Sequence, residues 1–435
     1  IGAHPDLSII EMTATSSLKH GLTFQRSHHL KNLTIKTTAD LASNYDMYGV
    51  RMNLDGVTIS GGNQAVKWES LKVRGFNNSL YIDGGDAYNV DRVYFNDLDL
   101  KCTGPASTYI GSCLYVNRIN QIYGTHCQLD QNDTGEHAIY CFGSKNIVLD
   151  GFKIRNATKG EAQAIKLVGN GVAPDDDQAY PTWCVRNMDI ADCLNGILCG
   201  IYGTETLDAL TVENCKFLDV DSTSGILGIV YLSAAGTSTI RSLKVSNITH
   251  RNSLYQGVHC ATAAGATIGQ LTIRDCNAYN WSTSSAGSYT WFGTSGSGTF
   301  GPIHLENIEA NGNSNGKTIV GLTGQASTVS RLTFSNLRET GTTAPGRPLT
   351  DTDTSATFNF AIGNSWSVSG TRTVTAASNA VAGEVYVIRG SNANCTFTDN
   401  AVFSLNGNWV SASDKTLTLL CLTSSTFVEL ARSTN

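Results

Sequence analysis

Titratable side chains gather in one short stretch of the 435-residue chain. The segment GEHAIYC contributes Glu136, His137 and Tyr140, and the later segment KGEAQAIKL contributes Glu161 and Lys166. β-Elimination on an acidic sugar needs one group to neutralise the carboxylate, one to remove a carbon-bound proton and one to protonate the leaving oxygen. A lysine beside a histidine and a tyrosine can supply these roles. This stretch is therefore the candidate catalytic zone.

The two glutamates leave a second chemistry open. A glycoside hydrolase needs two carboxyl groups, about 5 to 5.5 Å apart for retention of configuration or about 6.5 to 9.5 Å apart for inversion. Glu136 and Glu161 lie at similar points of their segments, and either could also pair with Asp133 or with an aspartate of the run 175–177. We favour β-elimination because basic and aromatic residues accompany the zone. A glycan-binding adhesin or tail fibre without catalysis is the third alternative, and the titratable cluster argues against it.

An acidic insertion follows the zone. The segment GVAPDDDQAYPTW carries Asp175, Asp176 and Asp177. Long loops on a rigid scaffold often carry function, so these aspartates are candidate substrate-binding residues, and a solvated loop tip is the alternative. Three adjacent aspartates cannot all ligate one ion without a bend, so we predict no metal site and no cofactor.

A repeat must position these residues. A motif of apolar, any, apolar, any, Gly/Asn/Asp, apolar recurs about every 27 residues on average, which is one turn of a three-sided β-helix. Alternation along a strand buries the first and third residues, and the fifth residue turns the corner through the left-handed region. The copies begin at Leu33 (a weaker one), Met52, Leu71, Val93, Ile122, Ile147, Met188, Leu210, Leu243, Leu271, Ile303 and Leu332. The predicted corners are Gly56, Gly75, Asp97, His126, Gly151, Asp192, Asn214, Asn247, Asp275, Asn307 and Asn336.

The repeat predicts an all-β chain with a right-handed, single-stranded parallel β-helix. We expect residues 1–340 to form about twelve coils, 341–355 a Pro/Gly/Thr-rich linker, and 356–435 a small sandwich-like β domain. Because the chain begins at Ile1 and enters a coil-like pattern at once, we expect an upstream region to be missing. The sixth motif position holds Cys127, Cys193, Cys215 and Cys276, which we expect to stack as buried thiols in one interior column.

A second strand in each coil has a four-residue pattern: a small residue, an apolar residue, a residue that points outward, and another apolar residue. Its outward residues predict one exposed column, which reads Tyr81, Tyr115, Tyr140, Lys166, Leu198, Val230 and His259, with Arg51 and Lys67 as earlier members. Tyr140 and Lys166 are expected one rung apart, at about 5 Å. Tyr81 and Tyr115 are expected to form either a platform for sugar rings or a surface packing of the wall, and His259 to bind a further sugar.

Composition excludes several classes of protein. Only 15% of the residues are charged, and 43 glycines stand against 7 prolines, which favours β repeats over helices. The net charge of -6 argues against a nucleic-acid binder, which carries a concentrated basic face. No apolar run approaches the roughly 18 residues of a membrane span, so no membrane insertion is expected.

The coil motif, the Gly/Asn/Asp corner, the outward column and the terminal β segment together resemble the pectin-lyase-like β-helix family, in particular bacteriophage tailspike depolymerases. The resemblance covers residues 20–340 and the tail from Thr371 onward. It implies a homotrimer on the virion tail that binds and cleaves a bacterial surface or extracellular polysaccharide, with a secreted bacterial enzyme as the alternative. It also implies that the terminal β domain serves trimerisation or glycan binding. The shared motifs are structural, so they name neither the substrate nor a catalytic residue.

Overall fold

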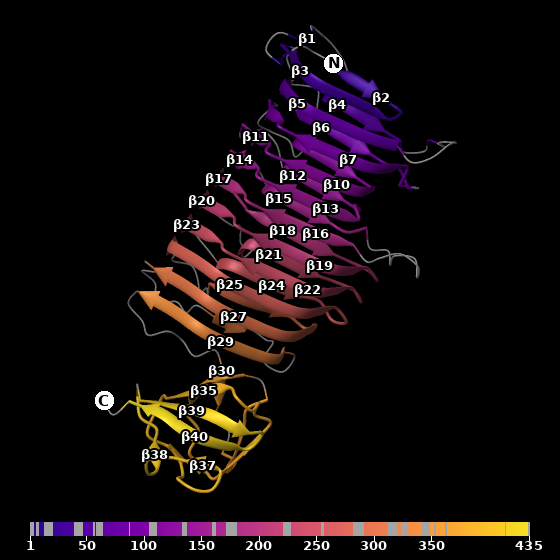
Figure 1. Cartoon of the computed structure of the whole chain (residues 1–435). Helices are drawn as coiled ribbons and strands as arrows, with labels where there is room; N and C mark the ends of the chain where they lie inside the picture. Colours follow the sequence, from indigo (N-terminus) through magenta and orange to yellow (C-terminus); the bar gives the residue numbers. More distant parts are fainter. Residues whose placement is uncertain are drawn as a thin grey trace.

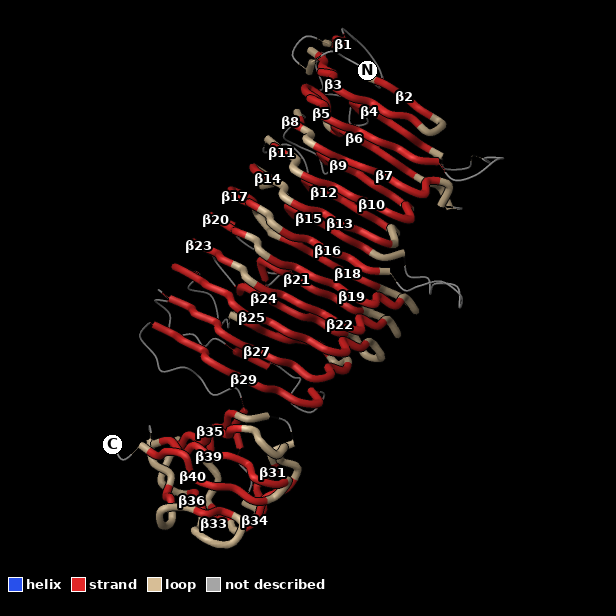
Figure 2. The backbone as a smooth tube through the Cα atoms, viewed as in Figure 1, coloured by secondary structure: helices blue, strands red, loops and turns tan. Residues whose placement is uncertain are grey.

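The computed structural model places the coils of the chain as a stack of strands that is followed by a separate C-terminal domain (Figure 1). It describes residues 4–5, 8–12, 21–38, 47–54, 57, 64–86, 88–103, 111–132, 137–158, 162–170, 181–220, 228–253, 256–281, 291–311, 320–322, 329–340, 349–351, 354–361, 363–413 and 415–433. These residues contain strands, turns and loops but no helix (Figure 2). The predicted all-β parallel β-helix is confirmed.

One wall of the stack is an 11-stranded parallel sheet, here called the first face. Its strands, in spatial order, are β2 (Leu22–Phe24), β4 (Tyr48–Asn53), β6 (Asn78–Asp83), β9 (Ser112–Asn117), β12 (His137–Phe142), β15 (Gln163–Val168), β18 (Ile197–Ile201), β21 (Gly228–Ala234), β24 (Gln256–Thr262), β26 (Phe292–Gly296) and β28 (Val320–Leu322). Strands of successive coils are neighbours in this sheet, so an outward residue of one coil lies one rung from its counterpart in the next.

An 18-stranded sheet forms the other two walls. The second face consists of β7 (Val90–Asn96), β10 (Ile119–Thr125), β13 (Asn146–Asp150), β16 (Thr182–Arg186), β19 (Thr206–Glu213) and β22 (Thr239–Ser246). The third face consists of β8 (Asp99–Cys102), β11 (Gln128–Asp130), β14 (Lys153–Arg155), β17 (Asp189–Cys193), β20 (Lys216–Val220) and β23 (Thr249–Ser253). The remaining strands are β1 (Ile9–Met12) and the long strands β3 (His28–Thr37), β5 (Gln64–Phe76), β25 (Thr267–Trp281), β27 (Thr299–Asn311) and β29 (Val329–Thr340).

The corner between the second and third faces is a column of left-handed residues. Strand register aligns Asn32, Ser70, Asp97, His126, Gly151, Asn187, Asn214, Asn247, Asp275, Asn307 and Asn336, and all of them have positive φ. Side-chain amides link many of these rungs; Asn247, for example, donates to Asn214 at 2.8 Å. These φ values confirm the predicted left-handed corner. Most of the residues there are Asn, Asp or Gly because these types tolerate the left-handed conformation.

Four copies of the motif, those predicted from Leu33, Met52, Leu71 and Met188, were assigned to the wrong position in their coils. Ile147 pairs with Trp183, and Trp183 pairs with Leu210, so the copy in this coil is WCVRNM and its corner is Asn187. The copy expected from Met188 lies further along, on the third face, although Asp192 also has positive φ. Met52 lies on the first face in β4, and Leu71 pairs with Leu33 beyond the corner at Ser70.

The interior is apolar and contains the predicted thiols. Cys127, Cys215 and Cys276 occupy the buried position after the corner, and all are free cysteines. Cys193 is buried too, but it pairs with Val220 on the third face and therefore belongs to a different column from the one predicted. Gly56 lies outside the described residues.

The C-terminal domain contains a six-stranded sheet of β30 (Leu349–Asp351), β32 (Ser365–Val368), β35 (Val385–Gly390), β39 (Thr416–Thr423), β40 (Thr426–Arg432) and β37 (Phe403–Ser404). Two smaller sheets comprise β31 (Thr357–Asn359) with β34 (Ala376–Ser378), and β33 (Arg372–Val374) with β36 (Cys395–Phe397) and β38 (Trp409–Val410). Because β30 pairs with β32, this domain begins before the expected residue 356.

The domain attaches to the last described coil. Gly363 forms a bridge with Leu332 of β29, and the amide of Asn364 donates to the Leu332 carbonyl at 3.2 Å. The guanidinium of Arg331 forms an ion pair with Glu384, next to the Tyr386 hydroxyl. Part of the β29 edge is thus paired, which limits association through a free strand edge.

Two buried histidines predict acid sensitivity of the fold. Trp291 donates from Nε1 to Nε2 of His250 at 2.7 Å, and burial lowers the pKa of His250 from 6.5 to about 3. Burial likewise lowers the pKa of His259 from 6.5 to about 4. A lowered pKa in the folded state means that the unfolded chain binds more protons below pH 6.5. The stabilising contribution of each neutral histidine is therefore complete above pH 6.5 and is lost as the pH falls toward the folded pKa.

We expect each histidine to lower the free energy of unfolding by about 1.4 kcal/mol per pH unit below the unfolded pKa. Urea unfolding of the wild type and of His250→Gln, measured at several pH values, tests this. The difference in unfolding free energy between the two proteins should shrink as the solution is acidified. A difference that is independent of pH would contradict the assignment of a neutral, buried His250.

Candidate functional site

The outward column on the first face carries the candidate site. Strand register aligns Arg51, Tyr81, Tyr115, Tyr140, Lys166, Leu198, Tyr231 and His259, one residue from each successive coil. The predicted adjacency of Tyr140 and Lys166 is confirmed. We call this set the first-face column.

Two members of the predicted column were wrong. Val230 is fully buried, and Tyr231 takes its place between Leu198 and His259. The four-residue pattern starts one residue later in β21, which moves every side chain to the opposite side of the strand. Lys67 lies on β5 and pairs with Tyr94 of the second face, so it does not belong to the column.

The tyrosines of the column stack on one another. The rings of Tyr81 and Tyr115 lie 5.0 Å apart and are inclined by 18°. Each ring therefore covers one face of its neighbour, and the wall offers ring edges and hydroxyl groups where the sequence predicted an open platform. Burial raises the pKa of both phenols, with the nearby Asp83 carboxylate as a further cause. At neutral pH the two hydroxyls are protonated and can donate hydrogen bonds.

Asp83 is a member of the site that sequence reasoning missed. The residue is only 5% exposed at the end of β6. It accepts hydrogen bonds from the Tyr81 hydroxyl at 3.3 Å, the Asn117 amide at 2.9 Å and the Gly85 backbone at 2.9 Å. A carboxylate after the outward tyrosine, with asparagine at the same point of the next coil, was the available signal. This carboxylate fixes the Tyr81 end of the column.

The centre of the column is a cluster of His137, Tyr140 and Lys166. Nζ of Lys166 lies 3.2 Å from Nε2 of His137 and 5.2 Å from the centroid of the Tyr140 ring. The rings of His137 and Tyr140 are 5.3 Å apart and nearly perpendicular. Three of the five residues predicted for catalysis are thus in contact. Tyr140 is also turned edge-on to Tyr115, at 86°, so the stack of parallel rings ends beside the lysine.

Contacts on both ring nitrogens fix the position of His137. The residue is 1% exposed, and the backbone N–H of Gln163 donates to its Nδ1 at 3.2 Å. Its Nε2 faces the nitrogen of Lys166 at 3.2 Å. The buried ring therefore holds the end of the lysine side chain in place.

His259 is in register with the column, but it is not exposed as predicted. Its side chain is 3% exposed. Nδ1 lies 2.7 Å from Oε1 of Gln256, and Nε2 lies 2.8 Å from Oγ of Ser295. The ring also stacks on Tyr231 with an inclination of 2°. Both nitrogens are already engaged, so this histidine supports the wall around Tyr231.

Five predicted site residues lie outside the described residues. They are Glu136, Glu161, Asp175, Asp176 and Asp177. The carboxylate pair that a hydrolase requires is therefore not placed. In the part of the chain that the structure describes, no three His, Cys, Asp or Glu side chains are grouped as a metal site would need.

Comparisons with family models, with curated proteins and with solved structures gave no match for this chain. Among the described residues, no helix has the length and apolarity needed to cross a membrane.

Proposed function

We propose that this protein cleaves an acidic polysaccharide by β-elimination on the first-face column. The observation that carries the proposal is the contact of 3.2 Å between Lys166 Nζ and His137 Nε2, next to the ring of Tyr140. General acid–base catalysis needs a positioned base and a positioned acid near one substrate atom. A lysine held in place beside a buried histidine and a phenol meets that requirement.

In the proposed reaction, the Lys166 amine removes the proton from the carbon next to the uronate carboxyl group. The electron pair of that bond forms a carbon–carbon double bond, and the glycosidic carbon–oxygen bond breaks. The Tyr140 hydroxyl gives its proton to the leaving oxygen. The protonated lysine and the tyrosinate then return to their starting states by exchange with water. His137 positions the lysine, and the hydroxyls of Tyr81 and Tyr115 hydrogen-bond neighbouring sugars.

We further propose that the chain belongs to a tailspike-like depolymerase, a homotrimer on a virion tail that acts on a bacterial surface polysaccharide. The long flat wall of the parallel β-helix suits a polymeric ligand, since equivalent side chains recur at a regular spacing. The C-terminal domain would serve trimerisation or glycan binding. These features support the proposal by analogy of architecture, and a secreted bacterial enzyme would use the same wall.

Digestion of a panel of bacterial capsular and extracellular polysaccharides tests the reaction class. We expect acidic members of the panel to yield an unsaturated uronate, detected by its ultraviolet absorbance, together with new reducing ends. New reducing ends without the absorbance would contradict elimination and show hydrolysis instead. Glu136 and Glu161 would then be the candidate catalytic carboxylates. Tight binding of a polysaccharide without either product would identify a glycan-binding fibre and contradict the proposed catalysis.

A further inference from the structure

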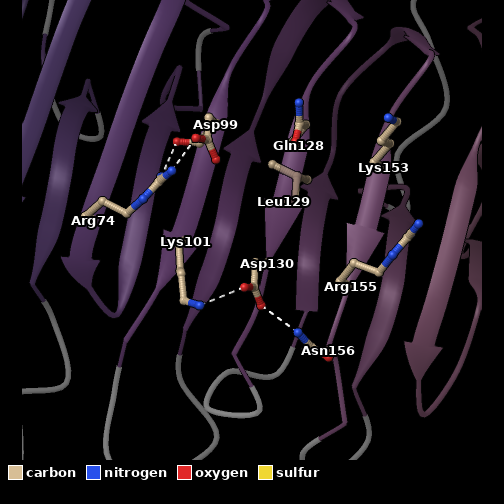
Figure 3. A pocket seen from close by; sticks show the side chains of 9 residues that line it. All are labelled: Arg74, Asp99, Lys101, Gln128, Leu129, Asp130, Lys153, Arg155 and Asn156. Atoms are coloured by element: carbon tan, nitrogen blue, oxygen red, sulfur yellow. Dashed lines mark hydrogen bonds and ion pairs between the residues drawn. The ribbon is translucent and has the colours of Figure 1, made fainter. Parts of the chain in front are cut away.

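The third face contains a hollow that the first-face column does not use. It has a volume of about 340 Å³. Its lining comes from four successive coils, on β5, β8 and β11 and on β14 with the residue that follows it (Figure 3). The lining residues are Arg74, Asp99, Lys101, Gln128, Leu129, Asp130, Lys153, Arg155 and Asn156. We call it the third-face groove.

Positive charge exceeds negative charge in the groove. Its lining holds four cationic side chains and two carboxylates, in a chain whose net charge is -6. Asp189, which pairs with Arg155 at 3.0 Å, adds a third carboxylate beside it, and the sum over these described residues stays positive. Lys153 is exposed, and its ammonium forms no ion pair with any residue that the structure describes. The groove therefore attracts anions although the whole chain is acidic.

Two arginines in the groove are held in the same way. Arg74 donates to the Val73 and Asp99 carbonyls and forms an ion pair with the Asp99 carboxylate. Arg155 repeats this arrangement with the Ile154 and Asp189 carbonyls, at 2.8 and 2.7 Å, and with the Asp189 carboxylate. A guanidinium has five N–H donors, and these contacts leave the Nε–H and one further N–H of each arginine for a ligand. Because both groups are already fixed, less side-chain entropy is lost when a ligand binds.

The carboxylates of the groove do not form a hydrolytic pair. Lys101 contacts Asp130 at 2.9 Å, and the amide of Asn156 donates to the same carboxylate at 2.9 Å (Figure 3). Burial alone would raise the pKa of Asp130, but these two partners and the Asn132 amide outweigh burial and lower it. A hydrolase needs one carboxylic acid that keeps its proton at working pH, whereas the lowered pKa of Asp130 favours the ionised form. Asp130 is therefore unsuited to the role of a catalytic acid, and its contacts favour a binding site.

We propose that the third-face groove is an anion-binding site that holds an acidic group of a carbohydrate chain. Lys153 and the free N–H donors of Arg74 and Arg155 would contact the anion, and Gln128 and Asn156 would contact sugar hydroxyls. A carboxylate and a sulfate both match this donor set. The site is separate from the first-face column, so its binding does not depend on the proposed elimination reaction.

Isothermal titration of the full chain with three hexasaccharides tests this site. The probes are oligogalacturonate, which carries carboxylates, a heparin fragment, which carries sulfates, and neutral maltohexaose. We expect at least one anionic probe to bind and maltohexaose not to bind. The variant Lys153→Ala/Arg155→Ala should weaken anionic binding by about tenfold or more, since each charged hydrogen bond contributes about that factor. Which anionic probe binds distinguishes a carboxylate site from a sulfate site.

Two controls separate the groove from its surroundings. Lys216→Ala, two rungs from Lys153 on the same face, removes one charge outside the groove and should leave binding unchanged. Lys244→Ala, on the second face and outside both proposed sites, should also leave it unchanged. Thermal unfolding of the double variant shows whether it is folded, and Lys153→Ala alone is the fallback if it is not. Equal binding by wild type and folded groove variants, no binding of either anionic probe, or an equal loss in Lys216→Ala would overturn the proposal.

Discussion

Lys166→Ala is expected to lower turnover of the acidic polysaccharide by about 10²- to 10⁴-fold, the usual contribution of one general acid or base. The side chain is half-buried in a strand and faces outward, so its removal leaves the interior of the coil intact. The loss should fall on kcat more than on KM, because the amine acts in the transition state. Initial rates of unsaturated-product formation measure it.

A second substitution at the same position separates two roles of the lysine. Lys166→Arg keeps a positive charge but cannot act as a base at neutral pH, because a guanidinium stays protonated. We expect it to be as inactive as Lys166→Ala if the lysine removes the proton. Substantial activity in Lys166→Arg would show instead that the side chain only neutralises the uronate. Lys244→Ala, on the second face, is the control and should keep wild-type rates. Full activity of Lys166→Ala would exclude the proposed centre.

Trp183→Ala is expected to lower the free energy of unfolding by about 3 to 5 kcal/mol, the usual cost of removing a buried tryptophan. The indole is 1% exposed and fills the interior between Ile147 and Leu210 of the adjacent coils. Its Nε1 also donates to the Lys145 carbonyl at 2.9 Å, which would lose this donor. Because coils contact only their neighbours, the loss of stability should be largest in the coils next to Lys166. Denaturant unfolding and hydrogen exchange measure the total and its distribution.

Tyr123→Ala is the matched control for the tryptophan. Tyr123 is a large aromatic residue on the second face, but it is 38% exposed and only stacks on Tyr94. The stacked pair contributes about 0.5 to 1.5 kcal/mol beyond the area that it buries, so Tyr123→Ala should lower the free energy of unfolding by less than Trp183→Ala does. Similar losses in both variants would argue that Trp183 is not part of a packed interior.

The β-helix itself was readable from local patterns. Alternation along a strand and a left-handed corner are properties of six consecutive residues, so Asp97, Asn214 and Asn336 were recognised without knowledge of their neighbours. The outward positions of Tyr115, Tyr140 and Lys166 followed from the same alternation, and strand pairing confirms them. The position of a candidate site formed by adjacent coils could therefore be predicted from the sequence.

Register between coils was not readable in the same way. WCVRNM and MDIADC both fit the motif, and only pairing with Ile147 shows that Trp183 begins the copy. A shift of one residue likewise exchanged Tyr231 for Val230, because a single step reverses the direction of a side chain. Because the coils differ in length, two segments can both match the motif. The local pattern cannot show which of them pairs with the strand of the preceding coil.

The sequence alone determined that this chain is a parallel β-helix with an aromatic and basic column, since both follow from residue types at a short period. Tertiary structure decided what the column can do. Stacking covers the faces of the Tyr81 and Tyr115 rings, and contacts with Gln163 and Lys166 fix the position of the His137 ring. It also built the third-face groove, whose arginines are oriented by aspartates one coil away. These properties depend on contacts between rungs, which no single coil of the sequence contains.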